Sequence, residues 1–242
     1  MKNWLDTKGV FKLRVSGVIT SKTYEKVTSD LKKFKYITPA ALALVVNSPG
    51  GSAIHSDLIY KAIRSFAEKH SIPVHSYAED CAASGGYYIM CAGDTLNATS
   101  GISLLGSIGS VAFLPNIKTL ASKYGLERRF WSTSPLDYQS LVDPLGTHNE
   151  EKSKKMKSIL QEIQNGFISV VSERRKGKIE VEGKKPDSVF NANVYYTPEA
   201  IELGLVDQKE SVEEGVKKMY PKLKVYDLSR ISWVEEFKKN FN

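Results

Sequence analysis

Short apolar runs alternate with amphipathic stretches along the first third of the chain. Phe11, Leu13 and Val15 place apolar side chains at every second position, as in a strand with one buried face. The run from Ala41 to Val46 is apolar throughout, which is typical of a central strand buried on both faces. The pattern predicts the order strand 11–19, helix 24–34, strand 41–46 and helix 54–66.

The alternation continues towards the C-terminus. Further predicted elements are a strand over 72–78, a short helix over 84–92, a strand over 95–98 and a long amphipathic helix over 149–175. A last helix is capped by Thr197, has Pro198 at its first position, stops at Gly204 and leads into a strand. This alternation predicts an α/β fold with a mainly parallel sheet and flanking helices.

Length and continuity indicate one domain. A chain of 242 residues can bury a substantial core. It shows no internal repeat, no low-complexity tract and no linker-like stretch that would divide it. We therefore predict a single domain over 1–242, with 208–242 as a C-terminal extension.

The charge balance is basic, with 34 Lys and Arg against 27 Asp and Glu, a net charge of +7. Such an excess favours polyanionic partners only where the charges gather with aromatic side chains. Here glutamates interleave with the basic residues, and no aromatic-rich binding signature accompanies them. We interpret the basic clusters as solvated helix faces and expect no nucleic-acid partner; these clusters are 152–157, 174–178 and 184–185.

Several classes of protein are disfavoured by what the sequence lacks. Its two cysteines, Cys81 and Cys91, cannot build a disulfide framework, and no His/Cys cluster has zinc spacing. We expect no cofactor and no metal. No apolar run of about 18 residues predicts a transmembrane segment, and the residues after Met1 resemble neither a secretory signal nor a transit peptide.

Two glycine-containing segments that follow predicted strands carry candidate chemistry. In one of them, Ser84 follows a strand and begins a helix, where helix amides favour negative charge. Gly85 and Gly86 directly after it let a substrate backbone approach closely. The alternative is a serine that only caps the helix beside a tight contact between helix and sheet.

The other segment is the turn Ser48-Pro49-Gly50-Gly51, which closes the buried strand over 41–46. It can direct a backbone amide, that of Gly51, towards the same cleft, with Gly85 as the partner donor for an oxyanion. Taken alone, such a sequence is only a turn. The pair is more specific, because ligands of open α/β sheets bind at the carboxyl ends of neighbouring strands.

Four segments in this order resemble the successive signatures of the signal peptide peptidase A family of serine peptidases. They are Asn47-Ser48-Pro49-Gly50-Gly51-Ser52, Glu79-Asp80-Cys81-Ala82-Ala83-Ser84-Gly85-Gly86-Tyr87-Tyr88, Leu105-Gly106-Ser107-Ile108-Gly109 and Glu202-Leu203-Gly204-Leu205-Val206-Asp207. The resemblance is strongest to the short alphaproteobacterial-type members. It implies the fold of the Clp protease and crotonase superfamily, with repeated ββα units, and assembly into rings or stacked oligomers.

The resemblance also implies roles for single residues. Ser84 would be the nucleophile, and Gly51 and Gly85 would donate hydrogen bonds to the oxyanion, with Gly50 in the same substrate-binding turn. Ser107 would help to place the catalytic base. The substrate would be a peptide, and the partners would be protein subunits.

The family's catalytic base is a lysine, kept neutral by burial, which takes the proton from the serine. This chain contains no lysine over 124–151, where the base is expected. Alignment backward from Asp143-Pro144 puts Gln139 at the lysine position, whereas counting forward from Ser84 puts Leu136 there. Neither side chain accepts a proton near neutral pH, so the catalytic dyad is broken within this chain.

Another base is conceivable. His55 follows the glycine turn, but we expect it on a helix that faces neither Ser84 nor the cleft. A lysine from a neighbouring subunit is the alternative, and in a homo-oligomer it must come from elsewhere in the chain because every copy lacks the expected one.

Three functions stay open at this point. The leading hypothesis is a catalytically impaired peptidase homologue that acts as a subunit of a larger assembly. The second is an active serine endopeptidase that cleaves signal or membrane peptides with a lysine from a partner chain. The third is an acyl-binding role, which the retained Ser84 disfavours. The resemblance suggests a mitochondrial protein, but the sequence does not decide the compartment.

Overall fold

The computed structural model describes residues 9–33, 39–134, 138–147, 149–179 and 189–230. By its internal contacts the chain divides into two compact units. One comprises Met1–Gly109 together with Phe167–Asn242, and the other is Ser110–Gly166. The single-domain assignment stays a prediction.

The first unit contains the sheet and most of the helices, and the helices and strands predicted from the apolar pattern are found there and in α6. The strand predicted over 72–78 continues to Ala83, directly before Ser84. The elements are β1 (Gly9–Ser16), α1 (Ser21–Lys32), β2 (Ala41–Ser48), α2 (Ala53–His70), β3 (Val74–Ala83), α3 (Gly85–Met90), β4 (Thr95–Ala98), β5 (Leu104–Gly106), the end of α6 (Glu150–Arg174), β6 (Val194–Tyr196), α7 (Thr197–Glu202), β7 (Gln208–Lys209), α8 (Val212–Met219), β8 (Lys224–Asp227) and the 3-10 helix Leu228–Arg230.

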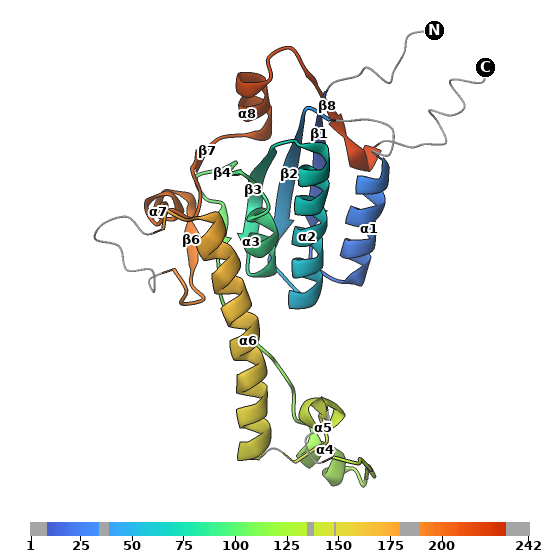
Figure 1. Ribbon diagram of the computed structural model, residues 1–242. Helices are drawn as coiled ribbons and strands as arrows, with labels where there is room; N and C mark the ends of the chain where they lie inside the picture. The colour runs from blue at the N-terminus through green and yellow to red at the C-terminus, as the bar shows by residue number, and fades with distance from the viewer. Residues whose placement is uncertain (1–8, 34–38, 135–137, 148, 180–188, 231–242) are drawn as a thin grey trace, which may run out of the picture. The chain divides into compact units, whose positions relative to one another are not determined.

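The strands of the described residues form one eight-stranded sheet (Figure 1). Its order is β6-β5-β3-β2-β1-β8, and β4 pairs with both β3 and β7. All strand pairs are parallel except β5 with β6. This confirms the mainly parallel sheet. Residues from Gln208 onward, which the sequence suggests as an extension, add β7 and β8 to this sheet.

Helices cover the two faces of the sheet unequally. α1, α2 and α3 lie side by side on one face (Figure 1), over the main core formed by alternate strand residues such as Leu13 and Leu44. The intervening residues, among them Val10 and Ala43, face a smaller core under α8. β2 is therefore buried on both faces from Ala41 to Val46, as its continuous apolar run predicts.

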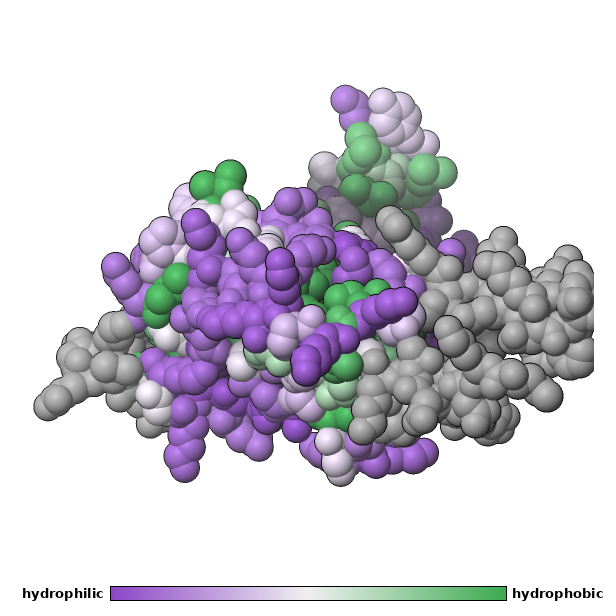
Figure 2. Space-filling view, turned by 90° about the horizontal axis from the view of Figure 1, so that it is seen from above, coloured by the Kyte–Doolittle hydropathy of each residue, from purple (hydrophilic) through white to green (hydrophobic). Residues whose placement is uncertain are grey.

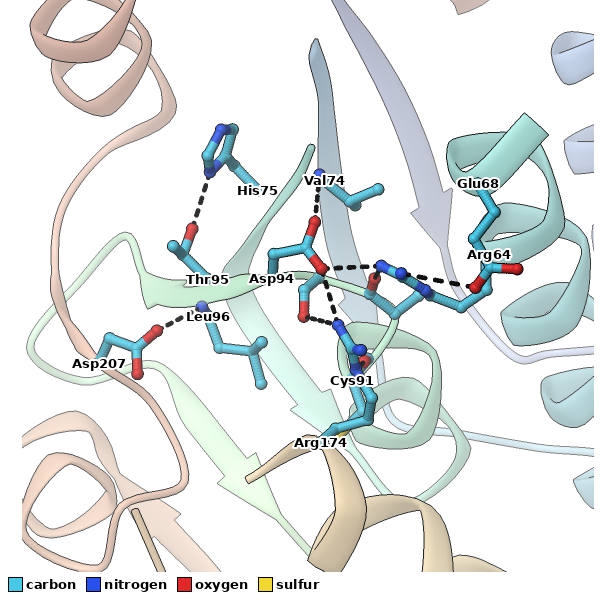
Figure 3. Close-up of polar contacts among 12 residues, drawn as sticks. Arg64, Glu68, Val74, His75, Cys91, Asp94, Thr95, Leu96, Arg174 and Asp207 are labelled. Carbon is cyan, nitrogen blue, oxygen red and sulfur yellow. Dashed lines mark hydrogen bonds and ion pairs between the residues drawn. The ribbon is translucent and has the colours of Figure 1, made fainter. Parts of the chain in front are cut away.

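The last turn of α6 is fixed to the first unit by ion pairs. Arg174 pairs with Asp94 at 2.9 Å, as Figure 3 shows. Arg175 is only 1% exposed; it pairs with Asp207 at 2.9 Å and donates to the Gly204 carbonyl at 2.7 Å. The expectation of a solvated basic cluster is wrong for Arg175, because a carboxylate and a carbonyl pair with its buried guanidinium, whereas Lys176 and Lys178 are exposed as expected.

The other basic clusters differ from this one. The side chains of Lys154, Lys155 and Lys157 are exposed on α6, as expected of a solvated face. Lys184 and Lys185 lie outside the described residues. In the view of Figure 2, hydrophilic side chains cover most of the described surface around the sheet.

His75 is buried and links β3 to the end of α8. Its ring nitrogens bond to Thr95 Oγ1 at 2.9 Å and to the Tyr220 hydroxyl at 3.0 Å. Burial lowers the pKa of His75, although Asp94 and Glu210 oppose the shift. His75 therefore binds a proton less readily in the folded state than in the unfolded chain, where it becomes protonated below a pH of about 6.5.

Stability should consequently fall as the pH drops below about 6.5, with a slope of at most about 1.4 kcal/mol per pH unit for this one proton. Urea unfolding of the wild type and of His75→Gln at pH 7.5 and pH 5 measures it. The wild type is expected to lose more unfolding free energy than the variant between the two values. Equal losses in both proteins contradict the prediction.

The second unit, 110–166, contains α4 (Lys118–Lys123), α5 (Tyr138–Val142) and the first part of α6. Hydrogen bonds hold it together, such as Ile117 N–H to the Pro144 carbonyl at 2.8 Å. Among its described residues no apolar side chain is buried. Large apolar side chains are exposed on α4 and on the chain before and after it. They are Val111, Phe113, Leu114, Ile117, Leu120, Tyr124, Leu126, Phe130 and Trp131, which we call the apolar segment.

Candidate active site

Ser84 stands at the sharp turn between β3 and α3. Its φ of 52° lies in the left-handed region, which serine rarely adopts. The turn is held on both sides, because Ser84 N–H donates to the Gly106 carbonyl at 2.8 Å and Tyr88 N–H donates to the Ser84 carbonyl at 3.0 Å. Strained backbone of this kind persists only where the surroundings fix it, and it is frequent at active sites.

The glycine turn after β2 lies directly against Ser84. Gly50 has a φ of +104°, and a Cβ atom there would lie 2.8 Å from Ser84 Cβ and 2.9 Å from Gly85 N. Real side chains do not make such contacts, so only glycine fits. β2 and β3 are neighbours and run parallel. The structure thus brings Gly50, Ser84 and Gly85 together, as the two strand ends predict.

The peptide between Gly50 and Gly51 is oriented by the turn after β1. Ile19 N–H donates to the Gly50 carbonyl at 2.9 Å, and Ser52 N–H donates to the Ile19 carbonyl at 2.9 Å. In a trans peptide the N–H points opposite to the carbonyl, so Gly51 N–H points away from Ile19. Within the described residues, neither Gly51 N–H nor Gly85 N–H donates to an acceptor. Two amide donors therefore stand at or beside Ser84, although their role as an oxyanion site stays a prediction.

Strand pairing places Ser107 near Ser84. β5 pairs with β3 in a register that sets Gly106 against Ala83, one residue before Ser107 and Ser84 respectively. Ser107 has a φ of 51°, and its N–H donates to the Asn193 carbonyl at 2.6 Å. Its part in placing a base stays a prediction.

Gln139 lies in α5 of the second unit, and its side chain is exposed. Leu136, which the alternative alignment places at the lysine position, lies outside the described residues. The assignment of Gln139 to that position stays a prediction.

No base is bonded to the candidate nucleophile among the residues that the structure describes, since Ser84 Oγ makes no hydrogen bond with any of them. His55 is engaged elsewhere, because its Nδ1 atom bonds to Ser52 Oγ at 2.9 Å at the start of α2. Asp80, which precedes the nucleophile, accepts a hydrogen bond from Asn47 at 2.9 Å. A carboxylate is also a weak base for a serine hydroxyl.

The two thiols offer no alternative nucleophile. Both cysteines are free, and burial raises the pKa of Cys81 and that of Cys91, the latter to about 12. Neither is therefore a thiolate near neutral pH. In the described part of the chain no group of three His, Cys, Asp or Glu side chains could hold a metal ion.

Residues 67–226 match the model of "Peptidase family S49". The chain belongs to this family. The match covers β3, Ser84 and the Gly204-to-Asp207 segment, and the α/β architecture described above is consistent with it.

Several relatives carry peptidase names. The chain is 26% identical to the "Putative signal peptide peptidase SppA" of Enterococcus faecium, over 93% of this chain and 67% of that protein. It is 33% identical to "Protease 4" of Haemophilus influenzae, over 74% of this chain and 28% of that protein. These similarities support a serine peptidase family of the signal peptide peptidase A type, as the sequence signatures predict.

A further relative has a different name. The chain is 37% identical to the "Na(+)/H(+) antiporter NhaA" of Brucella abortus over 74% of its own residues, but this region spans only 24% of that protein. Nothing about ion transport follows for this chain. None of the helices in the described ranges has the length and apolar character needed to cross a membrane.

Sequence reasoning missed one contributor to the site. Ile19 orients the Gly50–Gly51 peptide through its backbone N–H and carbonyl. A main-chain contact sets no demand on residue type, so no motif reveals it. Only the pairing of β1 with β2 brings this turn into position.

Proposed function

We propose that this chain is a peptidase-family S49 protein of the signal peptide peptidase A type that has lost independent catalysis and acts as a subunit of a larger assembly. The observation that carries the proposal is Ser84 in a turn with the unbonded amides of Gly51 and Gly85, while its Oγ makes no hydrogen bond with a base among the described residues. Acyl transfer needs a nucleophile, a base and oxyanion donors. This chain supplies the first and the third.

The nucleophile and its donors argue against simple decay of the site. Ser84 has a positive φ, a conformation that costs a residue other than glycine free energy and is frequent at active sites. An assembly that uses this surface for binding, or that completes it, accounts for their retention.

The apolar segment of the second unit supports a role within an assembly. Phe113 and Val111 are each 88% exposed, and Trp131 is 80% exposed. Exposed apolar side chains in such number are typical of protein interfaces rather than of free surfaces. A homo- or hetero-oligomer in which they are covered is therefore part of the proposal.

The second candidate is an active serine endopeptidase completed by a lysine from a partner chain, with signal or membrane peptides as substrates. The two unbonded amide donors favour it, because they are needed only if an oxyanion forms or an anion binds. The two candidates differ in whether a partner chain supplies the missing base.

The test uses a fluorophosphonate probe on the purified chain and on its native complex, each with and without Ser84→Ala. We expect no Ser84-dependent labelling of the pure chain, because no base removes the hydroxyl proton. Labelling confined to the complex supports the partner-supplied lysine. Labelling of the pure chain that disappears in Ser84→Ala overturns the impaired-subunit proposal.

A further inference from the structure

A single buried hydroxyl joins the two turns at the carboxyl end of the sheet. Ser48 is 0% exposed. Its Oγ–H donates to the Gly17 carbonyl at 2.6 Å, and the same oxygen accepts from Gly50 N–H at 3.1 Å. The side chain therefore bonds to the turn after β1 and to the glycine turn at once.

Both polar groups of Gly50 are held, one of them by Ser48. Its N–H goes to Ser48 and its carbonyl goes to Ile19 N–H. With both groups held, the dihedral angles of Gly50 are fixed, and so is the orientation of the next peptide, which carries Gly51 N–H, although two successive glycines would otherwise allow many orientations. Without the hydroxyl, the Gly50 N–H would lack its partner, and a change in the dihedral angles of Gly50 that brings this N–H to another acceptor also rotates the Gly50–Gly51 peptide.

Ser48 also touches the helix that follows the nucleophile. A Cβ atom on Gly86 would lie 2.5 Å from the Ser48 carbonyl oxygen and 3.2 Å from Ser48 Cβ. The same residue thus sets the glycine turn and packs against α3, whose first residue, Gly85, carries the second amide donor.

We propose that Ser48 is the positioning residue of the oxyanion donor Gly51 N–H. It does not touch the reacting atoms, and it acts through Gly50, whose N–H it holds. The inference rests on the proposed function, because an oxyanion site is what the orientation of Gly51 N–H serves.

One arm of the test is structural and needs no activity. Crystal structures of Ser48→Ala and of the wild type are compared at the Gly50–Gly51 peptide. We expect a rotated peptide in the variant, with Gly51 N–H displaced and Ser84 unchanged. Ser52→Ala is the matched control, because Ser52 Oγ bonds to His55 in the same loop and not to Gly50.

The other arm is kinetic. In the Gln139→Lys background, Ser48→Ala is expected to lower the fluorophosphonate labelling rate about 10-fold to 100-fold, by analogy with the loss of one oxyanion donor. The apparent pKa of the pH profile is expected to stay unchanged, since the base is untouched. Ser52→Ala in the same background is expected to label at a rate within about 3-fold of Gln139→Lys alone. A non-specific disturbance of the loop would lower the labelling rate of Ser52→Ala as well.

The outcomes separate this inference from the proposed function. An unrotated Gly50–Gly51 peptide in Ser48→Ala overturns the inference, and so does an unchanged labelling rate. If Gln139→Lys itself labels no faster than the wild type, the assigned base position fails and the crystal structures alone decide on Ser48. If Ser48→Ala does not fold, Ser48→Cys, whose thiol is a weak donor and acceptor, is expected to give a smaller change in the same direction.

Discussion

Gln139→Lys is expected to raise Ser84-dependent fluorophosphonate labelling of the purified protein by about a thousandfold or more. Loss of the base from a serine peptidase site costs several orders of magnitude in rate, so under the proposed function a lysine supplied at position 139 recovers a large part of them. Labelling is expected to increase with pH towards the pKa of the introduced amine, about 10.4 for a free lysine, because only the neutral amine accepts the hydroxyl proton. Time-resolved labelling at several pH values measures both effects.

Three variants control this experiment. Gln139→Met has a similar length without an amine and is expected to label no faster than the wild type. Leu136→Lys tests the alternative alignment, and faster labelling there than in Gln139→Lys shows that the lysine position was assigned wrongly. Ser84→Ala in the Gln139→Lys background is expected to abolish labelling. If neither lysine increases labelling, the result contradicts the proposal that the site lacks only a base.

Arg175→Ala is expected to lower the free energy of unfolding by about 3 kcal/mol. Removal of Arg175 takes away the buried partner of Asp207, which keeps only the exposed Lys178 as an ion pair, and it also leaves the buried Gly204 carbonyl without its side-chain donor. Burial by itself would raise the pKa of Asp207, but hydrogen bonds from Arg175, Lys178 and Leu96 N–H hold it below its ordinary value. Equilibrium urea unfolding monitored by circular dichroism measures the loss.

Lys178→Ala is the matched control, since Lys178 pairs with the same carboxylate oxygen but is 46% exposed. We expect it to cost less than about 1 kcal/mol. Because the folded-state pKa of Asp207 is depressed, the stability that the pair contributes is present above about pH 3.9 and is lost as the pH falls further. Equal losses for the two variants at pH 7 contradict a special role of the buried arginine.

Much of the fold could be predicted from apolar periodicity. β2 lies at the centre of the sheet because its six apolar residues can be buried on both faces, and α2 follows from helical spacing after the turn. The short strands β5 and β6 carry too few residues to show a period. The helices α4 and α5 of the second unit were equally hard to predict. Their surrounding apolar side chains are exposed, whereas apolar periodicity indicates an element only where one of its faces is buried.

The site could be predicted in part. Ser84 and the glycine turn follow strands that proved to be neighbours, so their proximity came from topology. The burial of Arg175 was not predictable, because a basic residue in a basic cluster gives no sign of a buried partner. The Gly204-to-Asp207 signature accordingly holds α6 to the sheet through Arg175, and Tyr87 bonds to the Leu205 carbonyl at 2.7 Å.

The turn after β1 sets a limit on how far this protein can be shortened. The region that matches the family model begins at residue 67, which is downstream of Gly50, Gly51 and the Ile19 backbone that orients them. A fragment cut at that boundary would keep Ser84 but lose β1 and β2, leaving one long edge of β3 unpaired. The candidate nucleophile Ser84 and the candidate donor Gly51 thus come from separate stretches of the chain, on either side of residue 67.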